Sequence, residues 1–450
     1  MVKRILIANR GEIVRRIIRT CKKMGIETVA VYSDADKNEK YLNEADFSYY
    51  IGPSAPVKSY LNIDAIINAV KETGADALHP GYGFLSESAA FAKAVTKAGA
   101  VFIGPDTDIL TRIESKCFCR QAAKKVGVPV TPGTINPVKS ADEIIKVSKE
   151  VGLPILLKLD KGGGGKGINK IQSVDDRAFV ESAFENIKAV GKMAFASEDV
   201  YVEKAVINPK HIEVQFVADN YGNVVCLGER ECSIQRRYQK IIEESPSSVI
   251  TDEERNILYD YTKLLVGEMK YTGAGTVEFL RGDDGSFFFM EINARLQVEH
   301  PVSEMVTGTD IVKLQIEIAS GLKLSLKQED IKLSGHAMEC RIYAENPKTF
   351  MPCPGTIDRI IFPEEKEHEV RIEHALYEGY KVSPFYDPML CKIIVRGEDR
   401  PDCINKMKKA LSDFSINGVD TTVTANIAIM ENEAFKSGNF TTAFLEKEKL

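Results

Sequence analysis

The sequence lacks the long apolar runs and the leader that would place it in or across a membrane. No stretch of about 18 apolar residues, the length that a spanning helix requires, occurs in the chain. Its start, "MVKRILIANRGEI", has neither the apolar segment nor the cleavage site of a secretory leader. Tryptophan is absent too, but 44% hydrophobic and 28% charged residues are typical of a globular protein. We therefore expect a soluble, cytoplasmic protein without a membrane partner.

Blocks of basic charge and paired cysteines are missing as well. The formal net charge is −6 and the basic residues are scattered, which argues against a nucleic-acid partner. Among nine cysteines no C-x-x-C pair occurs, and the closest two, Cys117 and Cys119, have no second pair nearby. We expect reduced thiols and no zinc site.

The pattern of the chain changes along its 450 residues, which are enough for about three domains. Near the N-terminus, short apolar runs alternate with helical stretches, as in "RILIAN", "GEIVRRIIRTCKKMG" and "ETVAVYS". This alternation predicts a doubly wound parallel α/β sheet. A helix containing Lys116 is expected from about Ile109 to the boundary at "VGVPVTPGT". From "HIEVQFVAD" onward, strands and hairpins predict an α+β or antiparallel layout, and a last unit from about residue 335 includes a helix at "PDCINKMKKALSDF".

Four consecutive glycines stand between two lysines in "KLDKGGGGKGI", residues 158–168. A domain linker and a wide turn are the simple interpretations. The stretch follows the apolar run "GLPILLK" and precedes "INKIQ", so we interpret it as the tip of a β-hairpin. Bare backbone N–H groups beside positive charge suit the phosphates of a nucleotide. A dinucleotide site for hydride transfer is disfavoured, because "IANRGEI" has one glycine where that fingerprint has three.

Polar residues occupy every second position of "MEINARLQVEHP", residues 290–301. Such alternation is typical of an edge strand with a solvated side, but the preceding "FFFM" is very apolar for an edge. On one face of an extended strand, Arg295 could hold an anion and Glu299 could accept a proton. The residues that would share this face are Glu291, Asn293, Arg295, Gln297 and Glu299.

The partner of this strand follows from "GTVEFLRGDDGSFFFMEI". Asp284-Gly285 predicts a two-residue type I′ turn, and pairing outward from that turn places Glu278 opposite Glu291. Carboxylates opposed across a ladder repel each other. A hard cation with oxygen ligands would compensate, and Mg²⁺ shared with phosphate fits best. The stretch therefore predicts an apparatus for phosphoryl transfer.

Three further clusters each have a structural and a functional interpretation. "EKAV", residues 203–206, either ends a strand with an ion pair or reads an adenine edge through its backbone. "ERECSIQRRYQK", residues 229–240, forms either a solvated cationic face or an anion site around its glutamine. "HPGYGFLSE", residues 79–87, follows a strand at the place where α/β sheets bind ligands. The lone His79 there is more often structural than catalytic.

These motifs occur along essentially the whole chain in the order in which biotin carboxylases carry them. They are "ILIANRGEI", "HPGYGFLSE", "GGGGKG", "HIEVQ", "ERECSIQRRYQK", "MEINARLQVEHPVSE" and "SPFYDPML". The chain thus resembles a biotin carboxylase, the ATP-grasp component of the biotin-dependent carboxylases. The resemblance implies a Rossmann-like N-terminal domain over residues 1–114 and an ATP-grasp domain over 115–334. A mobile lid would span about 132–203, and a β-rich C-terminal domain 335–450.

The resemblance also assigns site residues position by position. Those matching ATP contacts are Lys116, Lys158, Gly164, Gly165, Glu203, Lys204, Ala205, Val206, His211, Gln235, Glu278 and Glu291. Positions for Mg²⁺ or Mn²⁺ are Glu278, Glu291 and Asn293. The bicarbonate pocket matches Lys240, Arg295, Gln297, Val298 and Glu299, and the biotin side matches Tyr82, Gly83 and Arg341. The catalytic residues would be Lys240, Arg295, Glu299 and Arg341.

A reaction and its partners are implied in the same way. Glu299 would deprotonate bicarbonate for attack on the γ-phosphate of ATP, giving carboxyphosphate, and Arg341 would stabilise the enolate-like biotin as it captures CO₂. No A-M-K-M attachment site occurs, so biotin is expected on a carrier protein from another chain, alongside a separate carboxyltransferase. A homodimer is expected. The final acceptor, acetyl-CoA, propionyl-CoA or pyruvate, would be chosen on another subunit.

Two departures from the family pattern and two rival functions accompany this resemblance. Lys161 stands where the family usually has glycine, and Tyr238 where histidine is common. A different ATP-grasp ligase, joining an acyl phosphate to an amine, would leave "HPGYGF" and Arg341 without a role. A silent assembly protein is disfavoured because no expected ligand is replaced by an inert residue.

Overall fold

The computed structural model describes residues 2–162, 165 and 167–449. Its N-terminal part is a five-stranded sheet of order β3-β2-β1-β4-β5 in which all neighbours run parallel, as predicted. The strands are β1 (Arg4–Ile7), β2 (Glu27–Ser33), β3 (Phe47–Gly52), β4 (Ala77–His79) and β5 (Val101–Phe102). The helices are α1 (Glu12–Met24), α2 (Ile63–Thr73), α3 (Ala89–Lys97) and α4 (Thr107–Ile113).

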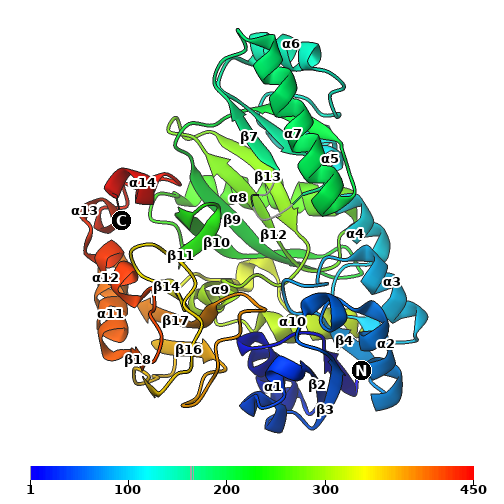
Figure 1. The fold of residues 1–450 in the computed structure, drawn as a ribbon, viewed down its shortest axis with the longest axis vertical. Coiled ribbons are helices and arrows are strands. Elements are labelled where there is room, and N and C mark those ends of the chain that lie inside the picture. The colour runs from blue at the N-terminus through cyan, green and yellow to red at the C-terminus, as the bar shows by residue number, and fades with distance from the viewer. Residues whose placement is uncertain (1, 163–164, 166, 450) are drawn as a thin grey trace.

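The glycine-rich stretch belongs to a small unit at the top of Figure 1. Strands β6 and β7 pair antiparallel on either side of it, so the hairpin interpretation is confirmed. The unit has an apolar core of its own, which makes it a separate packing body. It comprises α6 (Ala141–Val151), β6 (Ile155–Leu159), β7 (Ile168–Ile171), α7 (Arg177–Phe195) and β8 (Val200–Lys204).

The helix expected to contain Lys116 in its interior is instead two helices. Helix α4 ends at Ile113 and α5 (Lys116–Lys125) begins at Lys116, because Ser115 caps the second helix by accepting from the Phe118 N–H at 3.1 Å. Asp160, just after β6, accepts from the Cys117 N–H at 2.6 Å. The root of the glycine hairpin is therefore fastened to the N-terminus of α5, a position that favours anions.

An eight-stranded sheet of order β13-β12-β9-β10-β11-β14-β17-β16 forms the centre of the molecule. Its strands are β9 (Lys210–Ala218), β10 (Val224–Arg236), β11 (Gln239–Ser245), β12 (Gly273–Arg281), β13 (Phe287–Asn293), β14 (His336–Tyr343), β16 (Val370–His374) and β17 (Met389–Gly397). Neighbouring strands are antiparallel. One sheet thus crosses the expected boundary at residue 335, and the residue limits of the three domains stay a prediction.

Helices cover this sheet and complete the C-terminal part, drawn in orange and red in Figure 1. The helix predicted at "PDCINKMKKALSDF" is confirmed as α11. The remaining α-helices and β-strands are α8 (Asp252–Met269), α9 (His300–Thr307), α10 (Ile311–Ala319), β15 (Arg359–Ile361), α11 (Arg400–Asp413), β18 (Ser415–Asn417), α12 (Val423–Glu431), α13 (Glu433–Lys436) and α14 (Phe444–Glu448).

Strand β13 lies at the edge of the large sheet, so the argument that "FFFM" is too apolar for an edge is wrong. A segment of irregular chain covers that edge instead. Val130 bridges Phe289 in parallel, and the Phe289 N–H donates to the Pro129 carbonyl at 2.8 Å. Covering an edge with a loop protects its apolar side chains from water and from other strands.

The nine cysteines are unpaired, and all except Cys353 are buried. Within the described residues, no helix combines the length and the apolar character needed to cross a bilayer.

Candidate active site

Glu278 lies opposite Glu291 in the ladder between β12 and β13, as predicted. The predicted turn is nevertheless wrong. Gly282 N–H donates to the Ser286 carbonyl at 2.8 Å, which makes a three-residue loop with Gly285 at φ +81°. A bulge between Phe279 and Glu278 then shifts the register by one. The longer loop and the bulge shift the register by one residue in opposite directions, so Glu278 and Glu291 are paired as expected. The sequence did not reveal either shift.

The shared strand face predicted beyond this pair does not exist. Strand β13 ends at Asn293, and Glu299 is the N-cap residue of α9. The chain between them turns, yet it delivers Gln297 and Glu299 to the same interior, where they are 4% and 0% exposed. Tertiary folding rather than strand alternation therefore brings these groups together.

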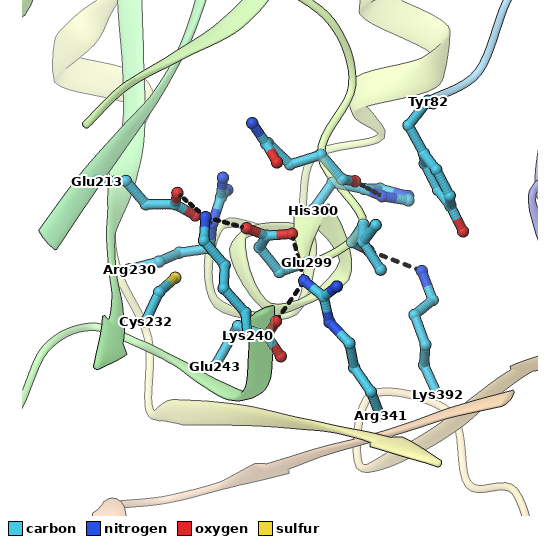
Figure 2. Close-up of polar contacts among 12 residues, drawn as sticks. Tyr82, Glu213, Arg230, Cys232, Lys240, Glu243, Glu299, His300, Arg341 and Lys392 are labelled. Atoms are coloured by element: carbon cyan, nitrogen blue, oxygen red, sulfur yellow. Dashed lines mark hydrogen bonds and ion pairs between the residues drawn. The ribbon is translucent and has the colours of Figure 1, made fainter. Parts of the chain in front are cut away.

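Lys240 is the centre of the buried polar cluster (Figure 2). Its Nζ lies 2.6 Å from Glu299 and 3.1 Å from Glu278. It also lies 2.6 Å from Glu213 on β9, a residue that the sequence analysis did not select. Glu213 pairs in turn with Arg230, which is fully buried. The alternation of His211 and Glu213 in "HIEVQ" was the available sign that both side chains face the site.

The three acids that contact Lys240, Glu213, Glu278 and Glu299, are held as carboxylates. Burial acts to raise the pKa of Glu299, but Lys240 and Arg341 outweigh it and hold that pKa below its ordinary value. Burial is likewise outweighed at Glu213, whose pKa Arg230 and Lys240 lower to about 2. A buried carboxylate that stays ionised beside two cations can accept a proton from an acid placed next to it.

Arg341 reaches the cluster from β14, on the far side of Glu299 (Figure 2). Its Nη2 lies 2.9 Å from Glu299 and 2.5 Å from Glu243 on β11. Glu299 thus stands between Lys240 and Arg341, each of which comes from a different strand. Sequence reasoning placed Arg341 at the site but missed Glu243.

Arg295 belongs to a neighbouring set of contacts rather than to the Lys240 cluster. Its Nε pairs with Glu87 at 2.8 Å, and its Nη1 donates to Gln297 at 3.1 Å. The Val298 carbonyl accepts from the buried Lys392 at 2.7 Å. Glu87 and Lys392 are two further site neighbours that sequence reasoning missed.

The lysines expected at the phosphates differ in their surroundings. Lys116 lies 3.3 Å from Glu291 and also donates to the Gly162 carbonyl at the root of the glycine hairpin. Lys158 instead pairs with Glu203, and Glu203 also accepts from Arg120 at 3.1 Å. The carboxylate of Glu203 therefore forms ion pairs at the end of its strand. This contact agrees with the structural interpretation of residues 203–206.

The other nucleotide positions surround these groups. His211 lies 2.9 Å from Glu278 and 2.6 Å from Gln235, so the structure brings those three together. At the strand end, the Lys204 side chain donates to Leu153 and the Ala205 N–H to Pro154. Val206 follows in irregular chain.

The two departures from the family pattern lie at the glycine hairpin. A Cβ on Gly165, whose φ is +72°, would come within 2.6 Å of the Tyr238 ring, so Tyr238 packs against the tip. Lys161 pairs with Glu114 at 3.0 Å, between partly exposed side chains. Gly164 lies outside the described residues.

The "HPGYGF" stretch borders the cluster from the N-terminal sheet. Tyr82 lies across from Arg341 in Figure 2, with its hydroxyl donating to Glu12, and Gly83 follows it at φ +67°. His79 is fully buried and accepts from the Gly81 N–H at 3.0 Å. Burial lowers the pKa of His79 to about 3, which makes it a structural imidazole.

The carboxylate pair has the donor set of a hard divalent cation. Glu278 and Glu291 are opposed in the ladder, and Asn293 donates to Glu278 at 2.7 Å while its amide oxygen accepts from Arg295 at 3.3 Å. Rotation of that amide would add a third oxygen, which fits Mg²⁺ shared with phosphate oxygens. In the protein alone, Lys240, His211 and Lys116 contact the two carboxylates.

Family models match nearly the whole chain. "Biotin carboxylase, N-terminal domain" matches residues 1–110, "Carbamoyl-phosphate synthase L chain, ATP binding domain" matches 115–327, and "Biotin carboxylase C-terminal domain" matches 339–447.

Whole-chain relatives agree with these matches. Biotin carboxylase 1 of Bacillus subtilis is 46% identical over 99% of this chain and 98% of its own length. The biotin carboxylase of Haemophilus influenzae is 47% identical over 100% of this chain and 99% of its own. The biotin carboxylase domain dimer of Hydrogenobacter thermophilus 2-oxoglutarate carboxylase, solved with MgADP, ADP and bicarbonate, superposes with a TM-score of 0.95. It is 42% identical, and the match covers 100% of this chain and 98% of that one.

Proposed function

Since the chain belongs to the biotin carboxylase family, we propose that it carboxylates biotin carried on a separate protein, as the first half-reaction of a multisubunit carboxylase. It is a ligase that uses ATP and bicarbonate. The observation that carries the assignment of its chemistry is the buried Glu299 carboxylate between Lys240 and Arg341. That arrangement combines a proton acceptor with cations on both sides of it.

In the proposed mechanism Glu299 takes the proton of bicarbonate, whose oxygen then attacks the γ-phosphate of ATP to give carboxyphosphate and ADP. Lys240 and Arg295 hold the anion, with Gln297 and the Val298 backbone lining its pocket. Glu278, Glu291 and Asn293 would hold Mg²⁺ or Mn²⁺, which supplies positive charge to the phosphates when bound. Carboxyphosphate yields CO₂ and phosphate, the phosphate takes the ureido proton of biotin, and Arg341 stabilises the resulting negative charge.

The nucleotide and biotin contacts extend this proposal to the rest of the site. Lys116, Lys158 and the glycine hairpin would contact phosphates, His211 and Gln235 the ribose side, and residues 203–206 the adenine. Tyr82 and Gly83 would border biotin. We further propose that the protein forms a homodimer in the cytoplasm and works with a biotin carrier protein and a carboxyltransferase. The proposed limits of its three domains are residues 1–114, 115–334 and 335–450.

Purified protein with Mg²⁺, bicarbonate and free biotin should release phosphate from ATP, and this release should increase with biotin. Phosphate release and carboxybiotin formation are the two quantities to measure. Turnover that ignores biotin but responds to an amine acceptor would favour the rival ATP-grasp ligase. A protein without turnover under any of these conditions would favour the silent assembly role.

Glu278→Gln and Glu291→Gln should both weaken the use of MgATP, in part reversibly with excess metal, but they should differ in stability. Glu278 is 3% exposed and contacts Lys240, His211 and Asn293, so its loss should lower the free energy of unfolding by about 1–3 kcal/mol. Glu291 is partly exposed, and its loss should cost less than about 1 kcal/mol.

The pH dependence of unfolding checks the same pair. Burial opposes ionisation of Glu278, but Lys240 and His211 hold its pKa below the ordinary value of 4.5. Its stabilisation is therefore present above pH 4.5 and is lost as the pH falls further, so the Glu278→Gln difference should shrink in acid. Loss of stability without loss of MgATP turnover in either variant would make the pair structural.

A further inference from the structure

Glu243 is a second carboxylate, besides Glu299, that contacts Arg341. It is fully buried on β11, and its Oε1 lies 2.5 Å from the Arg341 Nη2. The same nitrogen lies 2.9 Å from Glu299. Figure 2 shows this one nitrogen in contact with both carboxylates.

A second buried acid, Glu339, lies opposite Glu243 in the ladder between β11 and β14. It is also fully buried. Apart from the ion pair of Glu243 with Arg341, the oxygens of both acids lack hydrogen-bond partners among the described residues. Two carboxylates thus share one nitrogen of Arg341, whereas the cation that acts most on Glu339 is Lys392 on β17, ahead of Arg341. The other charged or titratable groups facing the two acids are Lys240, Cys232, Cys340, Tyr343 and Tyr82.

We infer that Glu243 is the positioning residue that keeps Arg341 in place while Glu299 carries a proton. This inference rests on the proposed function. When Glu299 accepts the proton of bicarbonate, it loses its charge and most of its attraction for Arg341. Glu243 is then the carboxylate still in contact with the guanidinium, at the moment when Arg341 has to meet biotin.

The pKa shifts of Glu243 and Glu339 are consistent with different roles for the two acids. Burial raises the pKa of Glu243 to about 7, and the Glu299 charge adds to the rise while Arg341 opposes it. Burial raises the pKa of Glu339 well above its ordinary value, with Lys392 too weak to offset it. Neutralising Glu299 removes a negative neighbour from Glu243, so Glu243 ionises more readily when it is needed.

The test compares Glu243→Gln with Glu339→Gln, two substitutions of nearly unchanged shape in neighbouring strands. In Glu243→Gln the ratio of biotin carboxylation to biotin-independent, bicarbonate-dependent ATP cleavage should fall by about 10- to 100-fold, because Arg341 is misplaced. In Glu339→Gln, which leaves the contacts of Arg341 with Glu243 and Glu299 in place, the ratio should stay within about 3-fold of wild type. Thermal unfolding of each variant shows whether it is folded.

The pH profile of biotin carboxylation is a further measurement, and it would not change in the variant if Glu243 had only a structural role. The rate of carboxylation by the wild type should decline as the pH falls through about 7. This decline should be absent in Glu243→Gln and present in Glu243→Asp, which keeps a carboxyl group. An unchanged ratio in Glu243→Gln, or equal losses in both glutamine variants, would overturn the inference. Wild-type protein that carboxylates no biotin at all would instead refute the proposed function, which the same assays distinguish.

Discussion

Arg341→Ala should lower biotin carboxylation by about 10²- to 10³-fold, the usual cost of losing one donor that stabilises developing charge. Most of the biotin-independent, bicarbonate-dependent ATP cleavage should remain. The physical reason is that Arg341 comes from β14, behind Glu299, whereas Lys240 holds Glu299 independently at 2.6 Å. Bicarbonate activation should therefore survive the loss of a group that acts when biotin becomes negative.

Arg295→Ala is the contrasting variant. Arg295 contacts Glu87, Gln297 and Asn293, so its loss should depress both ATP cleavage and carboxylation. Both activities are to be measured on both variants. Arg341→Ala also leaves Glu243 and Glu299 with one cation fewer in a buried site, so Arg341→Lys serves as a second variant that retains the charge. Equal losses in all four assays would mean that the arginines serve folding or one common anion site.

Glu299→Gln should lower both activities by about 10²- to 10⁴-fold, the range for a lost general base. The amide keeps the shape of the side chain but cannot take the proton of bicarbonate, so carboxyphosphate should not form and carboxylation should fail with it. Because the pKa of Glu299 is held below its ordinary value, the wild-type base is already ionised at neutral pH. Its own titration should therefore limit activity only in acid.

A matched control for this variant is Glu229→Gln. Glu229 is also fully buried and pairs with Arg255 on α8 at 2.7 Å, away from the Lys240 cluster. The Glu229→Gln variant should have a lower free energy of unfolding but retain turnover, whereas Glu299→Gln should lose turnover. Full ATP cleavage in Glu299→Gln would contradict the assignment of the base and direct attention to Glu213.

The family and the fold class could be predicted from the sequence because their evidence is local. The parallel sheet follows from apolar runs alternating with helices, and the glycine hairpin from its two flanking strands. The break before Lys116 was missed, because a Ser115 cap and the Asp160 contact decide it. The edge position of β13 was also missed, since its cover comes from Pro129 and Val130, remote in sequence.

The sequence by itself determined the parallel N-terminal sheet, the glycine hairpin, the family to which the chain belongs and which side chains are available for chemistry. Tertiary structure alone decided how those side chains are paired. The opposition of Glu278 and Glu291 depends on a bulge that compensates a longer loop, and the site around Lys240 draws on β9, β11, β14 and the start of α9. A buried ion pair depends on distances of a few ångströms between groups far apart in the chain, and only the packed sheet sets those distances. Hence the sequence indicated Glu299 and Arg341, while Glu213, Glu243 and Lys392 emerged only from the fold.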